Sequence, residues 1–277
     1  MQIAFTKMHG LGNDFLVVET AADGVRPDAD QWRRLGDRHA GVGFDQALLL
    51  EPARTARAIA SYRVYNADGS EAEQCGNGAR CLARYLHLSG RSETDGSVRL
   101  DSAGGPVAAR VLADGRVTVE LGVPNFDPRS LPFDAASAAS SYVLEAAGER
   151  VEFGAVAIGN PHAVVRVPSA GDAPVQRIGP ALQAHAAFPR QVNVGFMEVV
   201  DAANIRLRVH ERGAGETLAC GTGACAAVAV GRQWGLLGAT VEVHVPGGRL
   251  SVHWDGAGQN ILLTGPAEVA FTGQAEI

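Results

Sequence analysis

The stretch that decides the fold is RVYNADGSEAEQCGNGA at residues 63–79, because the chain contains it twice. Residues 208–224 read RVHERGAGETLACGTGA, and an offset of 145 residues aligns the two stretches without a gap. The alignment places Cys75 on Cys220 and matches both glycines of the two Cys-Gly-x-Gly-Ala segments. An internal match of this kind indicates a repeated structural unit.

Two further matches occur in the same order along the chain. GNDFLVV starts at Gly12 and GNPHAVV starts at Gly159, 147 residues later, while VGF starts at Val42 and again at Val194. Two repeats are too few for a solenoid, so we expect two similar domains that face each other. Residues 124–141, rich in Pro, Ser, Ala and Asp, are the expected crossover between them.

Each half is expected to consist mostly of strands, with one main helix after its Cys-Gly-x-Gly segment. Alternating or β-branched runs bounded by Gly, Pro or Asp predict strands. They are residues 47–52, 57–66, 98–102, 107–113 and 117–122 in the first half, and 142–146, 151–158, 163–167, 192–200, 205–211, 241–246, 250–254 and 261–266 in the second. ARCLARYLHL at 79–88 and ACAAVAVGRQWGLLG at 224–238 predict the helices. The expected fold class is therefore α/β, of the α+β type.

Cys75 and Cys220 stand where these two helices are expected to begin. Unpaired backbone N–H groups and the helix dipole favour an anion there, so we expect the pKa of each thiol to lie below its usual value of about 8.5. The glycines let backbone N–H groups approach a ligand, and one helix end can also hold a carboxylate. Inverting a carbon needs a base on one face and an acid on the other. Two thiols, one from each half, meet this need without a pyridoxal, flavin, nicotinamide or metal cofactor.

Other functions for these cysteines are open from the pattern alone. A thiol redox or binding protein is one alternative, although redox enzymes usually place the pair as Cys-x-x-Cys. A zinc site is disfavoured, because C-x5-C and C-x4-C differ from the usual spacing of structural zinc ligands. A P-loop is disfavoured, because CGNG lacks the Lys-Ser/Thr ending. Cys81 and Cys225 fall inside the expected helices and are interpreted as small buried hydrophobic residues.

The composition is that of an ordinary globular chain, with 277 residues, 46% of them hydrophobic and 19% charged. A net charge of -6 and the lack of a long Lys/Arg run disfavour nucleic acid as a partner. The sequence has no run of about 18 apolar residues, as a membrane span would require, and MQIAFTKMHG at residues 1–10 lacks the apolar centre of a signal peptide. We therefore expect a cytoplasmic protein whose four cysteines remain thiols.

Taken together, the motifs resemble those of the diaminopimelate epimerase family. They are MHGLGNDFLVVE, GVGFDQ, YNADGSEAEQCGNGARC, GNPHAV, VNVGFM, ERGAGETLACGTGA and TGPAE, and they run from Met8 to Glu268. The resemblance implies two pseudo-symmetric domains, each a curved, mostly antiparallel sheet around a central helix. We place them at residues 1–123 and 124–265, with a strand at 266–277 that returns to the first domain. It further implies conversion of LL-diaminopimelate to the meso form, in lysine and peptidoglycan-precursor synthesis.

The resemblance also assigns roles to individual residues. Cys75 and Cys220 are the acid/base pair, and His162 and Glu211 tune the thiols or the substrate. The residues expected to hold the substrate carboxylate at the reacting carbon are Gly76, Asn77, Gly221 and Thr222. Those expected to bind its ammonium are Asn13 and Gln46. Those expected to bind the far end of the substrate are Asn66, Asn160, Asn193 and Arg212, with Glu211 assisting. A homodimer is implied, with Phe271 at the contact.

The chemistry of these side chains agrees with such a substrate. Diaminopimelate is zwitterionic at both ends, and neutral amides offer donors and acceptors to ammonium and carboxylate alike. An arginine adds a bidentate fork for a carboxylate. Each asparagine taken alone also fits a turn, and His162 alone also fits a satisfied interior histidine. A relative of proline racemase is the second hypothesis, but the Glu211-Arg212 pair and the set of asparagines favour an open-chain diamino acid.

Overall fold

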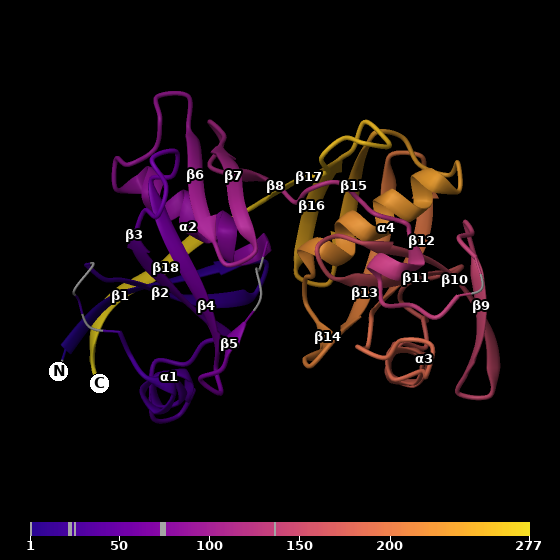
Figure 1. Ribbon diagram of the computed structural model, residues 1–277, viewed down its shortest axis with the longest axis horizontal. Helices are drawn as coiled ribbons and strands as arrows, with labels where there is room; N and C mark the ends of the chain where they lie inside the picture. Colours follow the sequence, from indigo (N-terminus) through magenta and orange to yellow (C-terminus); the bar gives the residue numbers. More distant parts are fainter. Residues whose placement is uncertain (1, 22–23, 25, 73–75, 136) are drawn as a thin grey trace. The chain divides into compact units, whose positions relative to one another are not determined.

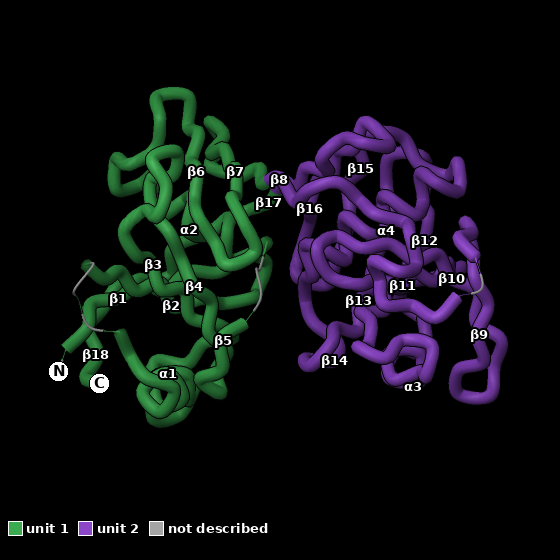
Figure 2. Tube along the Cα trace, viewed as in Figure 1, with its two compact units in different colours: residues 1–119, 265–277 green, residues 120–264 purple. Residues whose placement is uncertain are grey.

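The computed structural model describes residues 1–277 except for residues 1, 22–23, 25, 73–75 and 136. Cys75 therefore lies outside the described residues. The chain forms two compact units, shown in Figure 2: unit 1 comprises residues 1–119 and 265–277, and unit 2 comprises residues 120–264. Within the described residues, no helix has the length and apolar character needed to cross a membrane.

Unit 1 is a mixed sheet with one central helix, α2 (Figure 1). Its elements are β1 (Gln2–Gly10), β2 (Asn13–Glu19), α1 (Ala29–Gly36), β3 (Gln46–Pro52), β4 (Ala60–Asn66), β5 (Glu71–Ala72), α2 (Gly76–Leu88), β6 (Ser97–Ser102), β7 (Gly105–Val111), β8 (Val117–Glu120) and β18 (Glu268–Glu276). The pairs β2/β3 and β4/β6 are parallel. The pairs β18/β1, β1/β2, β3/β4, β4/β5, β6/β7 and β7/β8 are antiparallel.

Unit 2 repeats this arrangement around α4. Its elements are a 3-10 turn (Pro128–Ser130), β9 (Tyr142–Ala146), β10 (Glu149–Ala157), β11 (Pro161–Arg166), α3 (Val175–Gln183), β12 (Asn193–Asp201), β13 (Asn204–Glu211), β14 (Gly215–Thr217), α4 (Gly221–Gln233), β15 (Thr240–Val245), β16 (Gly248–His253) and β17 (Leu262–Gly265). The pairs β11/β12 and β13/β15 are parallel, at the places of β2/β3 and β4/β6. In the same way β9 pairs with β10, as β18 pairs with β1. The duplication seen in the sequence is therefore confirmed by the order and pairing of the strands.

One of the three sequence matches is wrong in structural terms. Residues 42–44 precede β3, whereas the second VGF, at residues 194–196, lies inside β12. The parallel registers give the true equivalence, because Phe15 pairs with Gln46 and His162 pairs with Asn193. Gln46 in unit 1 thus corresponds to Asn193 in unit 2.

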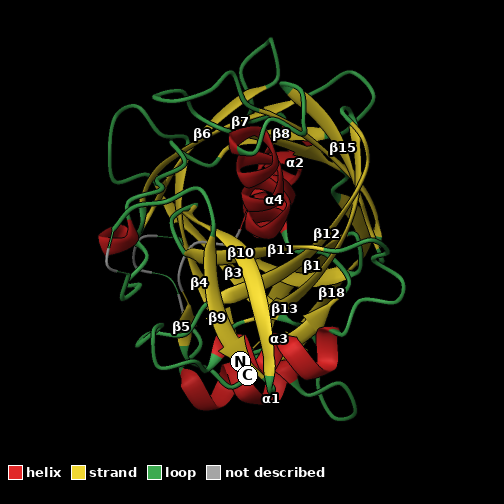
Figure 3. Ribbon diagram, turned by 90° about the vertical axis from the view of Figure 1, so that its right-hand side faces the viewer, coloured by secondary structure: helices red, strands yellow, loops and turns green. Residues whose placement is uncertain are grey.

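Each central helix packs inside the curved strands of its own unit, and the second helix of each unit lies outside them (Figure 3). In unit 1, Trp32 of α1 is fully buried and stacks on Tyr65 with ring centroids 5.1 Å apart. In unit 2, the core beside α3 includes Phe133 and Phe188, stacked at 4.6 Å. Burial of such rings and of the strand faces is the main source of stability in both units.

The helices differ from the sequence-based expectation in three ways. Helix α4 ends at Gln233, five residues before the predicted end at residue 238. Both α2 and α4 begin three residues earlier than predicted, so each Gly-x-Gly forms the first helical turn. Helices α1 and α3 were not expected at all. The start of α1 carries a sequence signal, a capping box in which Asp28 accepts from the Gln31 backbone and Gln31 accepts from the Asp28 backbone, both at 2.8 Å. Helix α3 has no side-chain cap and contains Pro180, so its sequence carries no comparable signal.

Candidate active site

In each unit, three strands bring polar residues to one edge of the sheet. In unit 2, β11 and β12 are parallel and start at this edge, while β13 runs antiparallel to β12 and ends there. Asn160 directly precedes β11, Asn193 starts β12 and Glu211 ends β13. Strand β14 and the start of α4 follow. The register therefore gathers residues from distant parts of the sequence beside the N-terminus of α4.

Cys220 is the N-cap residue of α4, as its position in the sequence predicted. Its Sγ accepts a hydrogen bond from the backbone N–H of Gly223 at 3.4 Å and lies 3.7 Å from the Thr222 hydroxyl. A Cβ on Gly223 would lie 3.1 Å from this sulfur. Glycine at 223 therefore permits the close approach of the helix N–H to the thiol.

The protonation state of Cys220 differs from the expectation. Burial raises the pKa of the Cys220 thiol well above its usual value, and the nearby Glu211 carboxylate, which accepts a hydrogen bond from the thiol, raises it further. The hydrogen bonds from Gly223 and Thr222 act in the opposite direction but are outweighed. The expected lowering of the pKa by the helix N-terminus is thus wrong for Cys220 in this structure, which holds it as a protonated thiol.

Glu211 is fixed in place for this contact. The hydroxyl of Thr217 donates a hydrogen bond to Glu211 Oε1. Thr217 ends β14, which pairs with β13 through Glu211 opposite Gly215. The hairpin of β13 and β14 therefore carries both the carboxylate and the hydroxyl that orients it, and places them beside the helix that begins at Gly221.

His162 is 1% exposed and stands in register beside Asn193. Burial lowers the pKa of His162 to about 3, and the positive charge of Arg212 lowers it further. The ring is therefore neutral near pH 7. Its Nε2 lies 2.9 Å from Asn160 Oδ1, so the Nε2–H tautomer donates to that amide. The structure thus joins two of the predicted residues, His162 and Asn160, in one hydrogen bond.

Asn193 and Arg212 are linked through the backbone. Asn193 donates from Nδ2 to the carbonyl of Pro161 at 3.0 Å, and its Oδ1 accepts from the Arg212 backbone N–H at 2.8 Å. The Arg212 guanidinium donates from Nη1 to the carbonyl of Arg190 at 3.2 Å. Asn193, 3% exposed, therefore ties the ends of β11, β12 and β13 together. Its bond to the Arg212 backbone also holds the chain next to Glu211, which bonds the Cys220 thiol.

In unit 1, the four predicted amides form two pairs. Asn77 donates to Asn13 Oδ1 at 3.0 Å. Gln46 donates to Asn66 Oδ1 at 3.1 Å, and Asn66 in turn donates to Ser70 Oγ at 3.0 Å. Asn13 and Gln46 start β2 and β3, and Asn66 ends β4, which is the same edge that unit 2 uses. Gly76 and Asn77 form the first turn of α2.

The sequence analysis missed two polar residues of unit 1, Asp45 and Arg80. Asp45 accepts from Asn13 Nδ2 at 2.9 Å and belongs to an ion cluster with Arg38, Asp14 and Lys7. Its signal in the sequence was its place directly before Gln46 in GVGFDQ. Arg80 is the other omission: it is fully buried in α2, and its Nε lies 3.4 Å from the carbonyl of Pro266. Cys81 and Cys225 are fully buried in α2 and α4, as expected for structural residues.

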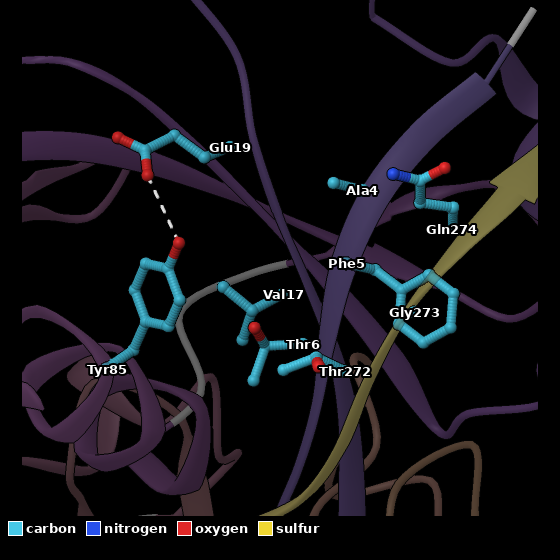
Figure 4. Close-up of a pocket in the computed structure, with 9 residues that line it drawn as sticks. All are labelled: Ala4, Phe5, Thr6, Val17, Glu19, Tyr85, Thr272, Gly273 and Gln274. Atoms are coloured by element: carbon cyan, nitrogen blue, oxygen red, sulfur yellow. Dashed lines mark hydrogen bonds between the residues drawn. The ribbon is translucent and has the colours of Figure 1, made fainter. Parts of the chain in front are cut away.

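Phe271 and a surface pocket lie elsewhere in unit 1. Phe271 on β18 is 50% exposed and packs edge-on against Phe5 with ring centroids 5.9 Å apart. A pocket of about 520 Å³ is shown in Figure 4. It is lined by Ala4, Phe5, Thr6, Val17, Glu19, Tyr85, Thr272, Gly273 and Gln274. The Tyr85 hydroxyl points to Glu19 and donates to it at 3.2 Å, but the lining includes none of the predicted site residues.

Sequence comparisons match this chain to one family of proteins. Residues 5–126 and 154–270 match the sequence profile of diaminopimelate epimerase. The chain is 53% identical to the diaminopimelate epimerase of Thioalkalivibrio sulfidiphilus over 279 residues and 50% identical to that of Alkalilimnicola ehrlichii over 282 residues. Both alignments cover 100% of this chain and 100% of the relative.

Solved structures share the fold at much lower identity. The hydroxyproline epimerase of Agrobacterium vitis superposes with a TM-score of 0.69 at 21% identity, over 99% of this chain and 92% of that chain. A phenazine biosynthesis protein of the PhzF family from Bacillus anthracis gives a TM-score of 0.69 at 17% identity, with 100% of both chains covered. These likenesses confirm the expected fold class.

Proposed function

The chain belongs to the diaminopimelate epimerase family, and on this basis we propose that it is an isomerase that converts LL-2,6-diaminopimelate to the meso form with Cys75 and Cys220 as paired acid and base. The reaction removes the α-proton on one face of the carbon and delivers a proton on the other face. One thiol ends the turnover deprotonated and the other protonated, and the roles exchange in the reverse direction. The two thiols supply both proton transfers without a cofactor.

The observation that carries this proposal is the environment of Cys220. Its thiol is buried at the N-terminus of α4 and donates its hydrogen bond to Glu211. In this state Cys220 is suited to act as the acid. When Cys220 acts as the base, its proton passes to Glu211, the carboxylate that already accepts the hydrogen bond. Thr217 keeps that carboxylate in position.

The two helix N-termini provide the second part of the chemistry. Removal of the α-proton pushes negative charge into the substrate carboxylate, where backbone N–H groups stabilise it. We assign this role to the first turns of α2 and α4, at Gly76 with Asn77 and at Gly221 with Thr222. Loss of one such donor in other enzymes costs about 2.7–4 kcal/mol.

Recognition of the rest of the substrate is assigned to the amides and the arginine. We place the reacting-end ammonium at Asn13 and Gln46. The distal amino-acid group is assigned to Asn66, Asn160, Asn193 and Arg212, with Glu211 assisting. The hydrogen bonds within each unit support this assignment, because Asn13, Asn66 and Asn193 each have partners at both ends of the amide, which holds it in one orientation.

The decisive experiment follows hydrogen exchange at the α-carbon. LL-diaminopimelate incubated with the protein in deuterium oxide gains deuterium at the inverted centre if a two-base mechanism operates. The meso product and the label are read by mass spectrometry and by chiral chromatography. L-Proline serves as the competing substrate, and its exchange in place of diaminopimelate would favour the proline racemase alternative. Activity should persist after exhaustive chelation, and activity that tracks a bound metal would contradict the mechanism.

We also propose a homodimer formed through β18 and a cytoplasmic location, where the thiols stay reduced. Among the described strands β18 pairs with β1 alone, and it carries the exposed side chains of Val269 and Phe271. An exposed edge strand with apolar side chains favours pairing with a second chain. Phe271→Asp should shift the protein toward the monomer in sedimentation experiments, and an unchanged molar mass would exclude this contact.

A further inference from the structure

In unit 1, a short series of side-chain amides ends on a carboxylate. Asn77 Nδ2 donates to Asn13 Oδ1 at 3.0 Å, and Asn13 Nδ2 donates to Asp45 Oδ2 at 2.9 Å. Asn77 is 3% exposed and lies in the first turn of α2, two residues after Cys75 in the sequence. The series therefore leads from Asp45 to the helix N-terminus that follows Cys75.

The carboxylate determines which way the amides point. The oxygen and nitrogen ends of an asparagine are nearly identical in shape, so their hydrogen-bond partners decide the orientation. The Asp45 carboxylate accepts hydrogen bonds from Arg38 and the Asp14 N–H, so Asn13 directs its NH₂ group to Asp45 and its oxygen away from it. Asn77 must then offer its own NH₂ group to that oxygen. One charged residue thus fixes the polarity of two amides.

Asp45 is itself firmly held. Arg38 Nη2 donates to Asp45 Oδ1 at 2.8 Å, and the Asp14 backbone N–H donates to Asp45 Oδ2 at 3.1 Å. The same guanidinium binds both oxygens of Asp14, at 2.7 and 3.0 Å. Lys7, 7% exposed, lies 2.6 Å from Asp14. Two cations and two carboxylates therefore form a neutral cluster behind Asn13.

The Asp14 carboxylate of the cluster stays ionised at neutral pH. Burial acts to raise the pKa of Asp14, but the hydrogen bonds from Arg38 and Lys7 outweigh it and hold the pKa well below its usual range. The backbone is also adapted to the cluster: Gly43 has a φ of +73°, and a Cβ there would lie 2.8 Å from Cγ of Arg38. This turn lets the chain pass close to Arg38 and places Asp45 beside Asn13.

We propose that Asp45 is a positioning residue for the amino-acid site, which, held by Arg38 and Asp14, keeps the Asn13 oxygen available to the substrate ammonium and directs the Asn77 amide toward Asn13. The inference rests on the proposed function through the role given to Asn13. An ammonium group only donates, so it requires the oxygen end of an amide. Its charge is the same before and during α-proton removal, so this contact binds the ground state and the transition state equally. Loss of such a contact raises KM more than it lowers kcat.

The test is Asp45→Asn, which keeps the shape of the side chain and removes its charge. The new amide can present either end to Asn13, so the polarity is no longer fixed. We expect KM for LL-diaminopimelate to rise about tenfold, the loss typical of one charge-assisted hydrogen bond. We expect kcat to change by less than about threefold, with the pH profile unshifted, because the thiols are untouched. The matched control is Asp101→Asn, because the Asp101 carboxylate, like that of Asp45, accepts from backbone N–H groups, here those of Arg54 and Thr55, but has no contact with Asn13 in the described structure.

Two further measurements make the outcome decisive. In an Asn13→Ala background, Asp45→Asn should leave KM unchanged, because Asp45 acts through Asn13; an independent tenfold rise would overturn the proposal. Side-chain amide signals of Asn13 and Asn77 in NMR spectra should shift in Asp45→Asn and not in Asp101→Asn, whether or not the protein is active. Unmoved amide signals, or a wild-type KM in a folded Asp45→Asn variant, also contradict the proposal. Failure of the proposed function is seen separately, as wild-type protein that does not epimerise diaminopimelate.

Discussion

The polar strand ends of the two units have the same backbone arrangement but carry different side chains. Asn66 ends β4 where Glu211 ends β13, and the two align at the offset of the duplicated motif. The unit 1 position is a neutral amide bonded to Gln46, whereas the unit 2 position is a carboxylate bonded to a thiol. The duplicated backbone thus supplies the same strand ends and helix N-terminus twice, while single side chains decide what each end can do.

The central helices differ in a similar way. Arg80 of α2 and Cys225 of α4 occupy equivalent positions, and both are fully buried. Helix α4 is built almost entirely of Gly, Ala and Val around this position, while α2 carries a cation there. Phe15, fully buried in β2, stands where unit 2 has His162. The titratable groups at equivalent positions therefore differ between the units, which predicts unequal effects for equivalent substitutions.

The largest effect is expected from the thiols themselves. Cys75→Ala and Cys220→Ala should each lower kcat by at least on the order of 10³-fold, because one face of the carbon then lacks its proton donor or acceptor. The assay is conversion of LL- to meso-diaminopimelate. Cys81→Ala and Cys225→Ala are the matched controls and should affect mainly stability. A folded Cys81→Ala variant as inactive as Cys75→Ala would refute the assignment.

A second substitution tests the carboxylate that only unit 2 has. Glu211→Gln should lower kcat on the order of 10²-fold, since the proton of Cys220 loses its acceptor. It should also lower the pKa of Cys220, because the neighbouring negative charge that raises it is gone. The pH dependence of Cys220 alkylation, followed by mass spectrometry, measures this shift. Glu216→Gln, which breaks a bond to Arg208 in the same hairpin, is the control and should leave that pKa unchanged.

Arg212 has no charged counterpart in unit 1, where Ala67 aligns with it. Arg212→Ala should lower kcat/KM for diaminopimelate by about 10- to 10²-fold, because remote binding positions the reacting carbon. Arg190→Ala is an informative control: Arg190 contacts Arg212 through its backbone carbonyl, which the substitution retains. Equal kinetics for Arg212→Ala and the wild type would make Arg212 a structural residue only.

The smallest effect concerns stability and the titration of His162, whose position in unit 1 is taken by Phe15. The folded-state pKa of His162 is lowered to about 3 from its usual 6.5. Below about pH 6.5 the unfolded chain therefore binds a proton at His162 that the folded protein does not bind. The free energy of unfolding consequently falls as the pH drops from there toward 3. Between pH 7 and 5 this residue should cost about 2 kcal/mol. Urea denaturation of the wild type and His162→Gln at both pH values measures it, and equal losses in the two proteins would contradict the burial of a neutral ring.

The sequence by itself determined the duplication, the Cys220 thiol at a helix start, and most of the strands. These features are local, because periodicity, glycine spacing and a repeated motif can be recognised without knowledge of long-range contacts. The VGF match misled because short apolar segments recur in loops and strands alike. Only the parallel register, which pairs Phe15 with Gln46 and His162 with Asn193, showed that Gln46 corresponds to Asn193.

The tertiary structure decided the electrostatics. The sequence places Cys220 at a helix N-terminus, which lowers a thiol pKa, but the fold buries it beside Glu211, and both effects raise that pKa. Likewise Asp45 and Arg38 lie seven residues apart, yet the hydrogen bond from Asn13 to Asp45 depends on how β2 and β3 adjoin. Desolvation and charge pairing depend on distances between residues remote in sequence, and such distances are set by packing.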